Sequence, residues 1–473
     1  MDSKEVDAIS KNPTICSVKS SCDSSDDDFN KISVPDGGYG WVVVFSSFIF
    51  NLCTWGAASG YSVYLSYYMS SDEYETGSDL DYAAIGGLSF GVGLFLAPLF
   101  NYLLIKTSTK KVLLLGIVVQ NVSVLLAAFA TKLWQVYLTQ GVAISFGLGA
   151  ICFPNTTIVA PWFRKRRSLA LGISAGGSGL GGIIFNLSMQ KIIDGKNVRW
   201  ALISQCIISS VLSTIALILV KTRKEEVEKH SDETSKVVAW EMFKYPVVWL
   251  LIGWVCFTML GYVIQLYSLF SFTVSLGYSS KQGSIVSSMI CLGAFLGRPT
   301  VGLISDIFGP VTTAMFCHLL VGILCYAMWI PCRSYATIIC FALFEGMMMG
   351  TIWPLLTSII TRLVGLRKLE SVYSVIWMFI GACSIVSPVI GLRLKRDDVK
   401  KGENAYLYTA IYAGAAYLCA ALSLCLMRGF LVARDQISMR ERTGYDDGEL
   451  QFQPEVKDAL RGTLTWKNLY RKI

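Results

Sequence analysis

Residues 162–190 read WFRKRRSLALGISAGGSGLGGIIFNLSMQ. Four consecutive basic residues, Arg164–Arg167, precede a stretch from 168 to 190 without any charged side chain. About 20 apolar residues in a helix are enough to cross the hydrocarbon core of a bilayer. Lys and Arg next to such a helix tend to stay on the cytoplasmic side. The stretch therefore predicts a membrane-spanning helix near 168–188 that begins at the cytoplasmic surface.

The whole chain has the composition of a multi-pass membrane protein. Its 473 residues are 53% hydrophobic and 16% charged, with a mean hydropathy of +0.52. A soluble domain needs more charge than this to cover its surface. The apolar stretches predict an all-α protein with twelve spans, near 41–69, 82–105, 112–130, 133–153, 168–188, 200–220, 247–270, 283–305, 311–330, 335–360, 371–392 and 406–427.

The spans fall into two groups of six, separated by a charged stretch. The predicted units are a disordered cytoplasmic tail (1–40), an N-terminal six-helix bundle (41–220), a cytoplasmic linker (221–246), a C-terminal six-helix bundle (247–427) and a cytoplasmic tail (428–473). The basic residues of the loops after spans two and four put both termini in the cytoplasm. The basic loop at 393–401 falls on the predicted outside and so conflicts with this orientation, but early spans usually dominate insertion.

Several functional classes lack their sequence signals. The net charge of +8 comes mostly from loops and the C-terminal tail, a distribution typical of topology signals and not of a nucleic-acid-binding face. There is no nucleotide-binding Gly-Lys-Ser/Thr loop, which argues against an ATP-driven pump. Fourteen cysteines are scattered singly, and the two histidines lie far apart in sequence. We therefore expect neither an enzyme nor a metal or other cofactor site.

Two halves of six spans resemble the major facilitator superfamily, in which two bundles rock about a central path. Gly302, Asp306 and Gly309 have the spacing G-x-x-x-D-x-x-G at the end of span eight, similar to the loop signature of that superfamily. Such proteins are secondary transporters that work by alternating access. The resemblance implies the same fold and mechanism for this chain.

Two blocks resemble the monocarboxylate transporter family more specifically. The first, VPDGGYGW at 34–41, enters span one, and the second runs from Trp162 to Gly181. In the first block Pro35 and the glycines allow a tight turn, and Asp36 is expected to cap the helix that follows. The resemblance gives structural and not substrate-binding roles to Asp36, Gly37, Gly38, Trp41, Arg166, Gly172, Gly177 and Asp306. The fungal homologues of the family, whose substrates are diverse, are the most similar.

This chain departs from the animal proton-linked members at two positions. Those members have a Lys in span one and an Asp four residues before the span-eight Arg. The matching positions here are Ser59 and Ala294, whereas the Arg is present as Arg298. The resemblance thus implies a transporter of a small organic solute and not a typical monocarboxylate–proton symporter.

Ionisable side chains inside spans are costly and often functional. Arg298 is a candidate for the substrate pathway, and its alternative role is a structural Arg bonded to helix carbonyls. Glu345 lies eleven residues beyond Ser334, roughly 16 Å into the bilayer at about 1.5 Å per residue. It is either a pathway residue or a neutral, hydrogen-bonded Glu between helices. Asn51 and Ser59 complete the candidate pathway.

The leading hypothesis is a secondary transporter with Arg298 and Glu345 along its path. A facilitator and a proton symporter both stay open, and the solute and the oligomeric state are not determined by the sequence. The rival class is a non-transporting membrane sensor or receptor on the same fold. The expected partners are a small organic solute, protons in the symporter case, and membrane lipid, without nucleic acid. The plasma membrane is favoured over the vacuolar membrane by the family resemblance alone.

Overall fold

The computed structural model describes residues 36–71, 78–223, 240–365, 368–395 and 405–440. The expected disordered tail up to residue 35, most of the linker and the chain beyond residue 440 lie outside the described residues. Within the described ranges every regular element is a helix.

Six spans form the N-terminal half. Span one is a run of short pieces with a π-helical turn, η2, in its middle, and span four contains a second such turn, η3. In chain order the elements are α2 (Gly40–Asn51), η2 (Leu52–Gly56), α3 (Ala57–Ser59), α4 (Tyr61–Ser71), α5 (Asp79–Phe95), α6 (Ala97–Lys106), α7 (Thr109–Ala127), α8 (Leu133–Val136), η3 (Tyr137–Ala143), α9 (Ile144–Val159), η4 (Ala160–Trp162), α10 (Arg167–Gly195) and α11 (Val198–Leu219).

The C-terminal half has six more spans. A third π-helical turn, η6, lies in span nine, and span ten is broken between α16 and α17. The elements are η5 (Trp240–Lys244), α13 (Pro246–Ser275), α14 (Ser280–Phe308), α15 (Pro310–Leu324), η6 (Cys325–Trp329), α16 (Tyr335–Met349), α17 (Ile352–Val364), α18 (Leu369–Leu394) and α19 (Leu407–Arg440). In the described chain 11 helices are long and apolar enough to cross a membrane, and the bent pair α5–α6 makes up to 12. The prediction of an all-α protein with twelve spans is confirmed.

Side chains and prolines at the span ends explain where several helices begin. Ser78 accepts a hydrogen bond from the backbone N–H of Asp81, whose side chain bonds back, and Ser279 and Gln282 form the same capping box before α14. Pro246 and Pro310 stand in the first turns of α13 and α15, where a missing N–H costs no hydrogen bond.

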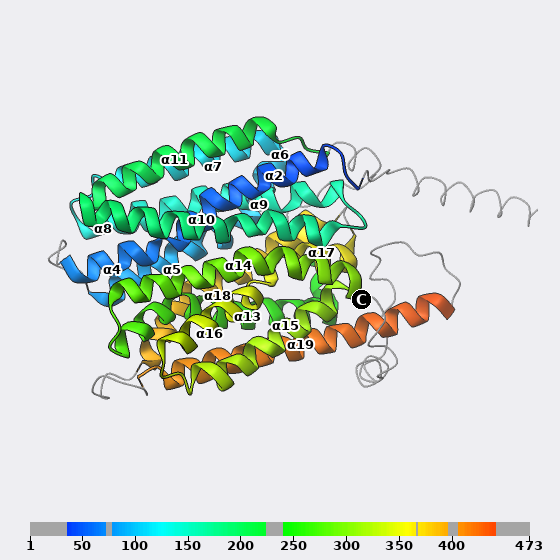
Figure 1. Cartoon of the computed structure of the whole chain (residues 1–473). Coiled ribbons are helices and arrows are strands. Elements are labelled where there is room, and N and C mark those ends of the chain that lie inside the picture. The colour runs from blue at the N-terminus through cyan, green and yellow to red at the C-terminus, as the bar shows by residue number, and fades with distance from the viewer. Residues whose placement is uncertain (1–35, 72–77, 224–239, 366–367, 396–404, 441–473) are drawn as a thin grey trace, which may run out of the picture.

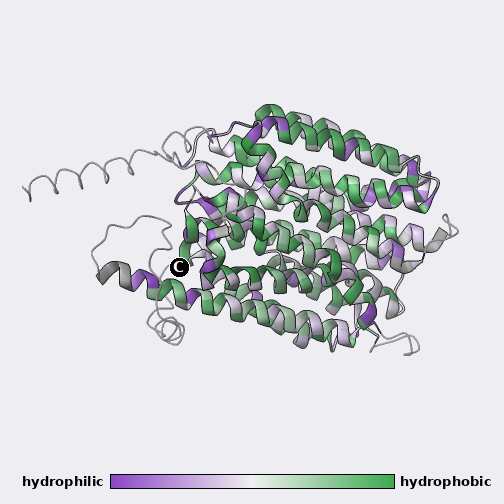
Figure 2. Cartoon of the chain, turned by 180° about the vertical axis from the view of Figure 1, so that it is seen from behind, coloured by the Kyte–Doolittle hydropathy of each residue, from purple (hydrophilic) through white to green (hydrophobic). Residues whose placement is uncertain are grey.

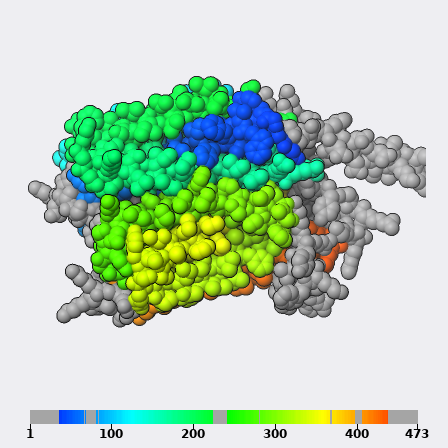
Figure 3. Space-filling model, in the orientation of Figure 1, coloured from blue at the N-terminus to red at the C-terminus, as the bar shows by residue number. Residues whose placement is uncertain are grey.

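The two halves lie side by side along their length. Figure 1 shows α2–α11 on one side and α13–α19 on the other, and Figure 3 shows the same division on the surface. They meet mainly along two helix pairs, α10 with α14 and α5 with α18. Both pairs approach closely because glycines face backbone: a Cβ on Gly172 would meet the carbonyl oxygen of Arg298, and one on Gly381 would meet the backbone of Phe95.

The outer helices present an apolar surface. Large hydrophobic side chains on α7 and α11 are exposed, among them Leu126 at 55% and Ile218 at 72%. In Figure 2 the hydrophilic colour gathers toward the two ends of the bundle. An apolar belt of this kind is what a bilayer requires of a spanning protein.

One end of the bundle brings together Tyr39, Phe163, Leu219 and Asp306, and we call it the linker end. Tyr39 Oη donates to the carbonyl oxygen of Leu219 (2.9 Å), and Asp306 bonds to the start of α10. The described chain starts and stops at this same end in Figure 1. The opposite end carries the starts of α5, α14 and α16.

The last helix is longer than the sequence predicts. The predicted tail begins at residue 428, whereas α19 continues to Arg440. Its charged residues are buried by protein contacts: Arg428 Nε donates to Thr312 Oγ1 (3.1 Å), and Asp435 forms an ion pair with Arg362 (3.3 Å). The mean hydropathy falls at these charged residues, which is why the sequence predicted the end of the span there, but the helix continues past them.

Candidate functional site

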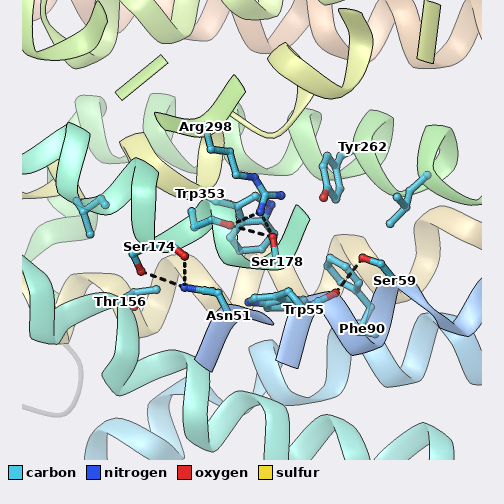
Figure 4. A pocket seen from close by; sticks show the side chains of 14 residues that line it. Asn51, Trp55, Ser59, Phe90, Thr156, Ser174, Ser178, Tyr262, Arg298 and Trp353 are labelled. Carbon is cyan, nitrogen blue, oxygen red and sulfur yellow. Dashed lines mark hydrogen bonds between the residues drawn. The ribbon is translucent and has the colours of Figure 1, made fainter. Parts of the chain in front are cut away.

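A cavity lies between the two halves, about midway along the spans. Its empty volume, with its open side included, is about 640 Å³. Figure 4 shows the side chains that surround it. The lining residues are Asn51, Trp55, Ala58, Ser59, Phe90, Thr156, Leu171, Ser174, Ala175, Ser178, Tyr262, Leu266, Arg298 and Trp353. Both halves therefore contribute to one space.

Arg298 of α14 places a positively charged guanidinium at this cavity. The residue is 6% exposed. Its Nη1 donates to the carbonyl oxygen of Ala175 (2.7 Å) and to Ser178 Oγ, both on α10 of the other half. Its Nε is buried without a hydrogen-bond partner, and no acidic residue in the described part of the chain pairs with it. One face of the guanidinium is thus bonded to protein, and its charge is not neutralised there.

Asn51 and Ser59 line the same cavity, but their donors are engaged within the protein. Asn51 Nδ2 donates to Ser174 Oγ (3.1 Å) and to the carbonyl oxygens of Ser47 (3.0 Å) and Ser174 (3.1 Å). Ser59 Oγ donates to the carbonyl oxygen of Trp55 (2.9 Å). Asn51 therefore holds α2 against α10.

Four aromatic rings form the rest of the wall. Trp55 lies 4.7 Å from Phe90 and 5.0 Å from Trp353, measured between ring centroids. Tyr262 completes the group at 6.3 Å from Trp353 and 6.4 Å from Phe90. These rings come from α5, η2, α13 and α17, and they give an apolar surface beside one cation. Three of these rings, Trp55, Phe90 and Tyr262, gave no signal in the sequence among the many aromatic residues of the chain.

Glu345 does not line the cavity. It is 1% exposed and packs inside the C-terminal half, with Oε1 3.9 Å from Cys325 Sγ. No ion pair joins it to Arg298 in the described residues. The structure thus brings Arg298, Asn51 and Ser59 together and separates Glu345 from them.

Asp36 does not cap the helix that follows it, so that prediction is wrong. Helix α2 begins only at Gly40, and its first N–H groups bond to the carbonyl oxygens of Gly37 and Gly38. Asp36 instead accepts hydrogen bonds from the backbone N–H groups of Arg164 (2.6 Å) and Lys165 (2.8 Å). The turn at Asp36 and Gly38, both with positive φ, directs the carboxylate away from α2.

The two family blocks are in contact with each other. Trp41 packs edge-on against Phe163 at 5.0 Å between ring centroids, and a Cβ on Gly40 would be 3.1 Å from the Phe163 ring. Gly37 and Gly38 form the turn before this contact, and Arg166 precedes the first residue of α10. Together these residues fix the start of α2 on the loop before α10.

Asp306 joins the two halves at the linker end. Its Oδ1 accepts from the backbone N–H of Ser168 (3.1 Å) and its Oδ2 from that of Leu169 (2.9 Å). These N–H groups belong to the first turn of α10, where no intrahelical acceptor is available. A residue of the C-terminal half therefore caps a helix of the N-terminal half. Gly172 and Gly177 lie on the same helix, facing α14 and α2.

Two bundles of six helices around one central cavity define a secondary transporter of the major facilitator type. A family model described as "Major Facilitator Superfamily" matches residues 42–388. The chain belongs to this superfamily, within a monocarboxylate-transporter-like family. It is a multi-pass membrane transporter of small solutes.

Three relatives illustrate the relationship. The chain is 48% identical over 447 residues to "Probable transporter MCH2" of Saccharomyces cerevisiae, covering 93% of each chain. It is 30% identical to "Uncharacterized transporter ESBP6" of the same yeast, over 88% of this chain and 62% of the relative. It is 26% identical to human "Monocarboxylate transporter 12", over 76% of each. All three names are transporter names, and none supports the sensor alternative.

Proposed function

We propose that this protein carries a small organic anion with an apolar body by alternating access. The proposal depends on one observation: the guanidinium of Arg298 is buried, its Nε has no hydrogen-bond partner, and no acidic residue of the described chain pairs with it. A carboxylate is the ligand that such a group prefers, because its two oxygens match the planar donors. The ring cluster of Trp55, Phe90, Tyr262 and Trp353 offers the contact for the apolar part.

Two further features belong to the same proposal. The position of the family's span-one Lys is Ser59 and that of the span-eight Asp is Ala294, so coupling to protons does not use the family's own carboxylate. The basic run Arg164–Arg167 lies at the linker end, where the described chain starts and stops. This supports cytoplasmic termini. The family favours the plasma membrane.

Counterflow in reconstituted vesicles tests the proposal. Vesicles loaded with unlabelled benzoate, phenylacetate or acetate are diluted into the labelled compound, and vesicles without protein give the background. Transient accumulation of label identifies a carrier, since a sensor exchanges nothing. We expect the two ring-bearing anions to be better substrates than acetate.

Arg298→Lys and Arg298→Ala then test the site. Losing a charge-assisted hydrogen bond costs about 1.5–3 kcal/mol, which corresponds to roughly a 10- to 150-fold rise in KM for the anion. Arg428→Lys is the matched control, because Arg428 is also buried (4% exposed) but lies on α19 and does not line the cavity. If both Arg298 variants transport like the wild type, Arg298 only holds α14 to α10 and the anion site is wrong.

A further inference from the structure

A second group of buried polar side chains lies inside the C-terminal half, away from the cavity. It consists of Glu345 on α16, Gln265 on α13 and Cys325 in η6, all 2% exposed or less. Gln265 Nε2 donates to Cys325 Sγ (2.9 Å), and Cys325 Sγ lies 3.9 Å from Glu345 Oε1. Cys325 opens the π-helical turn of span nine, and turns of this kind are frequent at functional sites.

Two acceptors in this group lack a donor. Glu345 Oε2 and Gln265 Oε1 are both buried and have no hydrogen-bond partner. Both side chains contact the same sulfur atom, Cys325 Sγ, Gln265 through Nε2 and Glu345 through Oε1. A buried acceptor left without a donor is costly, and a buried carboxylate without a cation is more so. In this arrangement Glu345 and Gln265 therefore each keep one acceptor oxygen without a donor.

Among the residues that the structure describes, no cation pairs with an ionised Glu345. The titratable side chains that face it are Cys325 and, from α19, Tyr417. His318 of α15 is bonded to Thr258 Oγ1 (2.9 Å). Arg298 of α14 lies against Gly350, more than a turn further along the span, with its Nε 3.1 Å from the place of a Cβ there.

A metal ion does not fit the group. Hard cations need about six oxygen ligands, and no cluster of three or more His, Cys, Asp or Glu occurs among the described residues. One proton does fit. The O–H of a neutral Glu345 would donate to Gln265 Oε1, and this single bond satisfies the amide oxygen while it removes the charge.

We propose that Glu345, Gln265 and Cys325 form a proton-binding site within the C-terminal half, separate from the anion cavity. The proton can leave because the site has a second bonding pattern. After a half turn of the Gln265 amide, its N–H₂ group donates to the carboxylate, and the Cys325 S–H donates to the amide oxygen. Each protonation state then has its own set of hydrogen bonds.

The site is connected to the cavity through one span. Next to Glu345, a Cβ on Gly346 would meet the carbonyl oxygen of Ile290 on α14. Further along the span, Gly350 touches Arg298 and Trp353 lines the cavity. On the proposed function, we expect a change of bonding at Glu345 to act on the groups that would bind the anion, because they lie along the same span. This link to transport rests on the proposed function, whereas proton binding itself does not.

Infrared difference spectroscopy of the full chain in lipid tests proton binding without any solute. A neutral buried carboxyl has a C=O band separate from the carboxylate and amide bands. We expect this band in the wild type at neutral pH, its loss at alkaline pH, and its absence in Glu345→Gln at every pH. Asp435→Asn is the control: Asp435 is also buried (4% exposed) but is paired with Arg362 and Arg434, so the band should stay.

Gln265→Leu gives a second readout if Glu345→Gln does not fold. It keeps the acid but removes its acceptor, so the C=O band should shift in frequency. The proposal is overturned if the wild type has no such band at neutral pH, if Glu345→Gln retains it, or if it persists unchanged to the highest pH at which the protein stays folded. In the last case Glu345 is permanently neutral packing. None of these results depends on whether an organic anion is carried.

Discussion

The cap that Asp306 places on α10 should control how long the linker end stays closed. Both of its bonds, to the N–H groups of Ser168 and Leu169, cross between the halves. Beside them Ser168 Oγ and Ser358 Oγ are 3.0 Å apart, also across the halves. Alternating access requires α10 and α14 to separate at this end. The bonds exist only while it is closed.

The size of the effect follows from the geometry. Removing a side-chain cap from a helix N-terminus costs about 1–2 kcal/mol, with the interaction between the carboxylate and the helix dipole included. Asp306→Ala removes this stabilising free energy from the closed state alone, because the cap is already broken in the open state. The ratio of closed to open molecules should therefore fall by roughly 5- to 30-fold.

Asp36→Ala is the matched control. Asp36 also accepts two backbone N–H bonds, from Arg164 and Lys165, but it belongs to the same half as they do. Its loss should lower thermal stability without shifting the equilibrium between closed and open. Spin labels on two exposed residues of the linker end, Lys165 and Ile307, in a background without native cysteines, report both populations as pulsed-EPR distances.

The expected result is a second, longer distance that grows in Asp306→Ala and not in Asp36→Ala. Asp306→Asn should be intermediate, since the amide keeps one acceptor oxygen. An unchanged distance distribution in Asp306→Ala, in a protein that remains folded, would refute the argument that this cap holds the halves together. Equal shifts in both variants would refute the assignment to the inter-half bonds.

Three other predictions concern topology, packing and coupling. Epitope tags at positions 230 and 460 should react with antibody only after permeabilisation, and a signal from the tag at 460 on intact cells would contradict the twelve-span topology. Gly172→Ala should reduce stability by about 1–3 kcal/mol because its Cβ meets the carbonyl oxygen of Arg298, whereas Gly176→Ala, with its nearest atom 3.5 Å away, should be tolerated; equal melting temperatures would contradict this. Glu345→Gln should make uptake of a transported anion equally fast with and without an inward proton gradient, and a gradient effect as large as in the wild type would exclude Glu345 from coupling.

The number and order of the spans could be predicted because apolar length is a local property of the sequence. The end of α19 could not. Arg428, Arg434 and Asp435 look like the start of a polar tail, yet contacts with Thr312 and Arg362 keep them buried in a continuing helix. Those partners are distant in sequence, and hydropathy does not register them.

Only part of the candidate site could be predicted, because the contacts that complete it also join residues distant in sequence. Arg298 was identifiable because a charge inside a span is rare, whereas its contacts with Ala175 and Ser178, which also fit the structural alternative, could not be predicted. Asp36 was misassigned because its partners are 128 and 129 residues away. Three rings of the aromatic wall gave no signal, since nothing in the order of residues distinguishes Trp55, for example, from the other tryptophans.

The glycines of α10 also limit how this transporter can change during evolution. On one side Gly172 and Gly179 lie against the backbone of α14, and on the other Gly177 and Gly181 lie against that of span one. Any side chain at these four positions would force helices apart, so these positions have almost no freedom to mutate. We therefore expect new substrate preferences to arise at other cavity positions, such as Phe90 and Trp353, where a ring can be exchanged without moving a backbone.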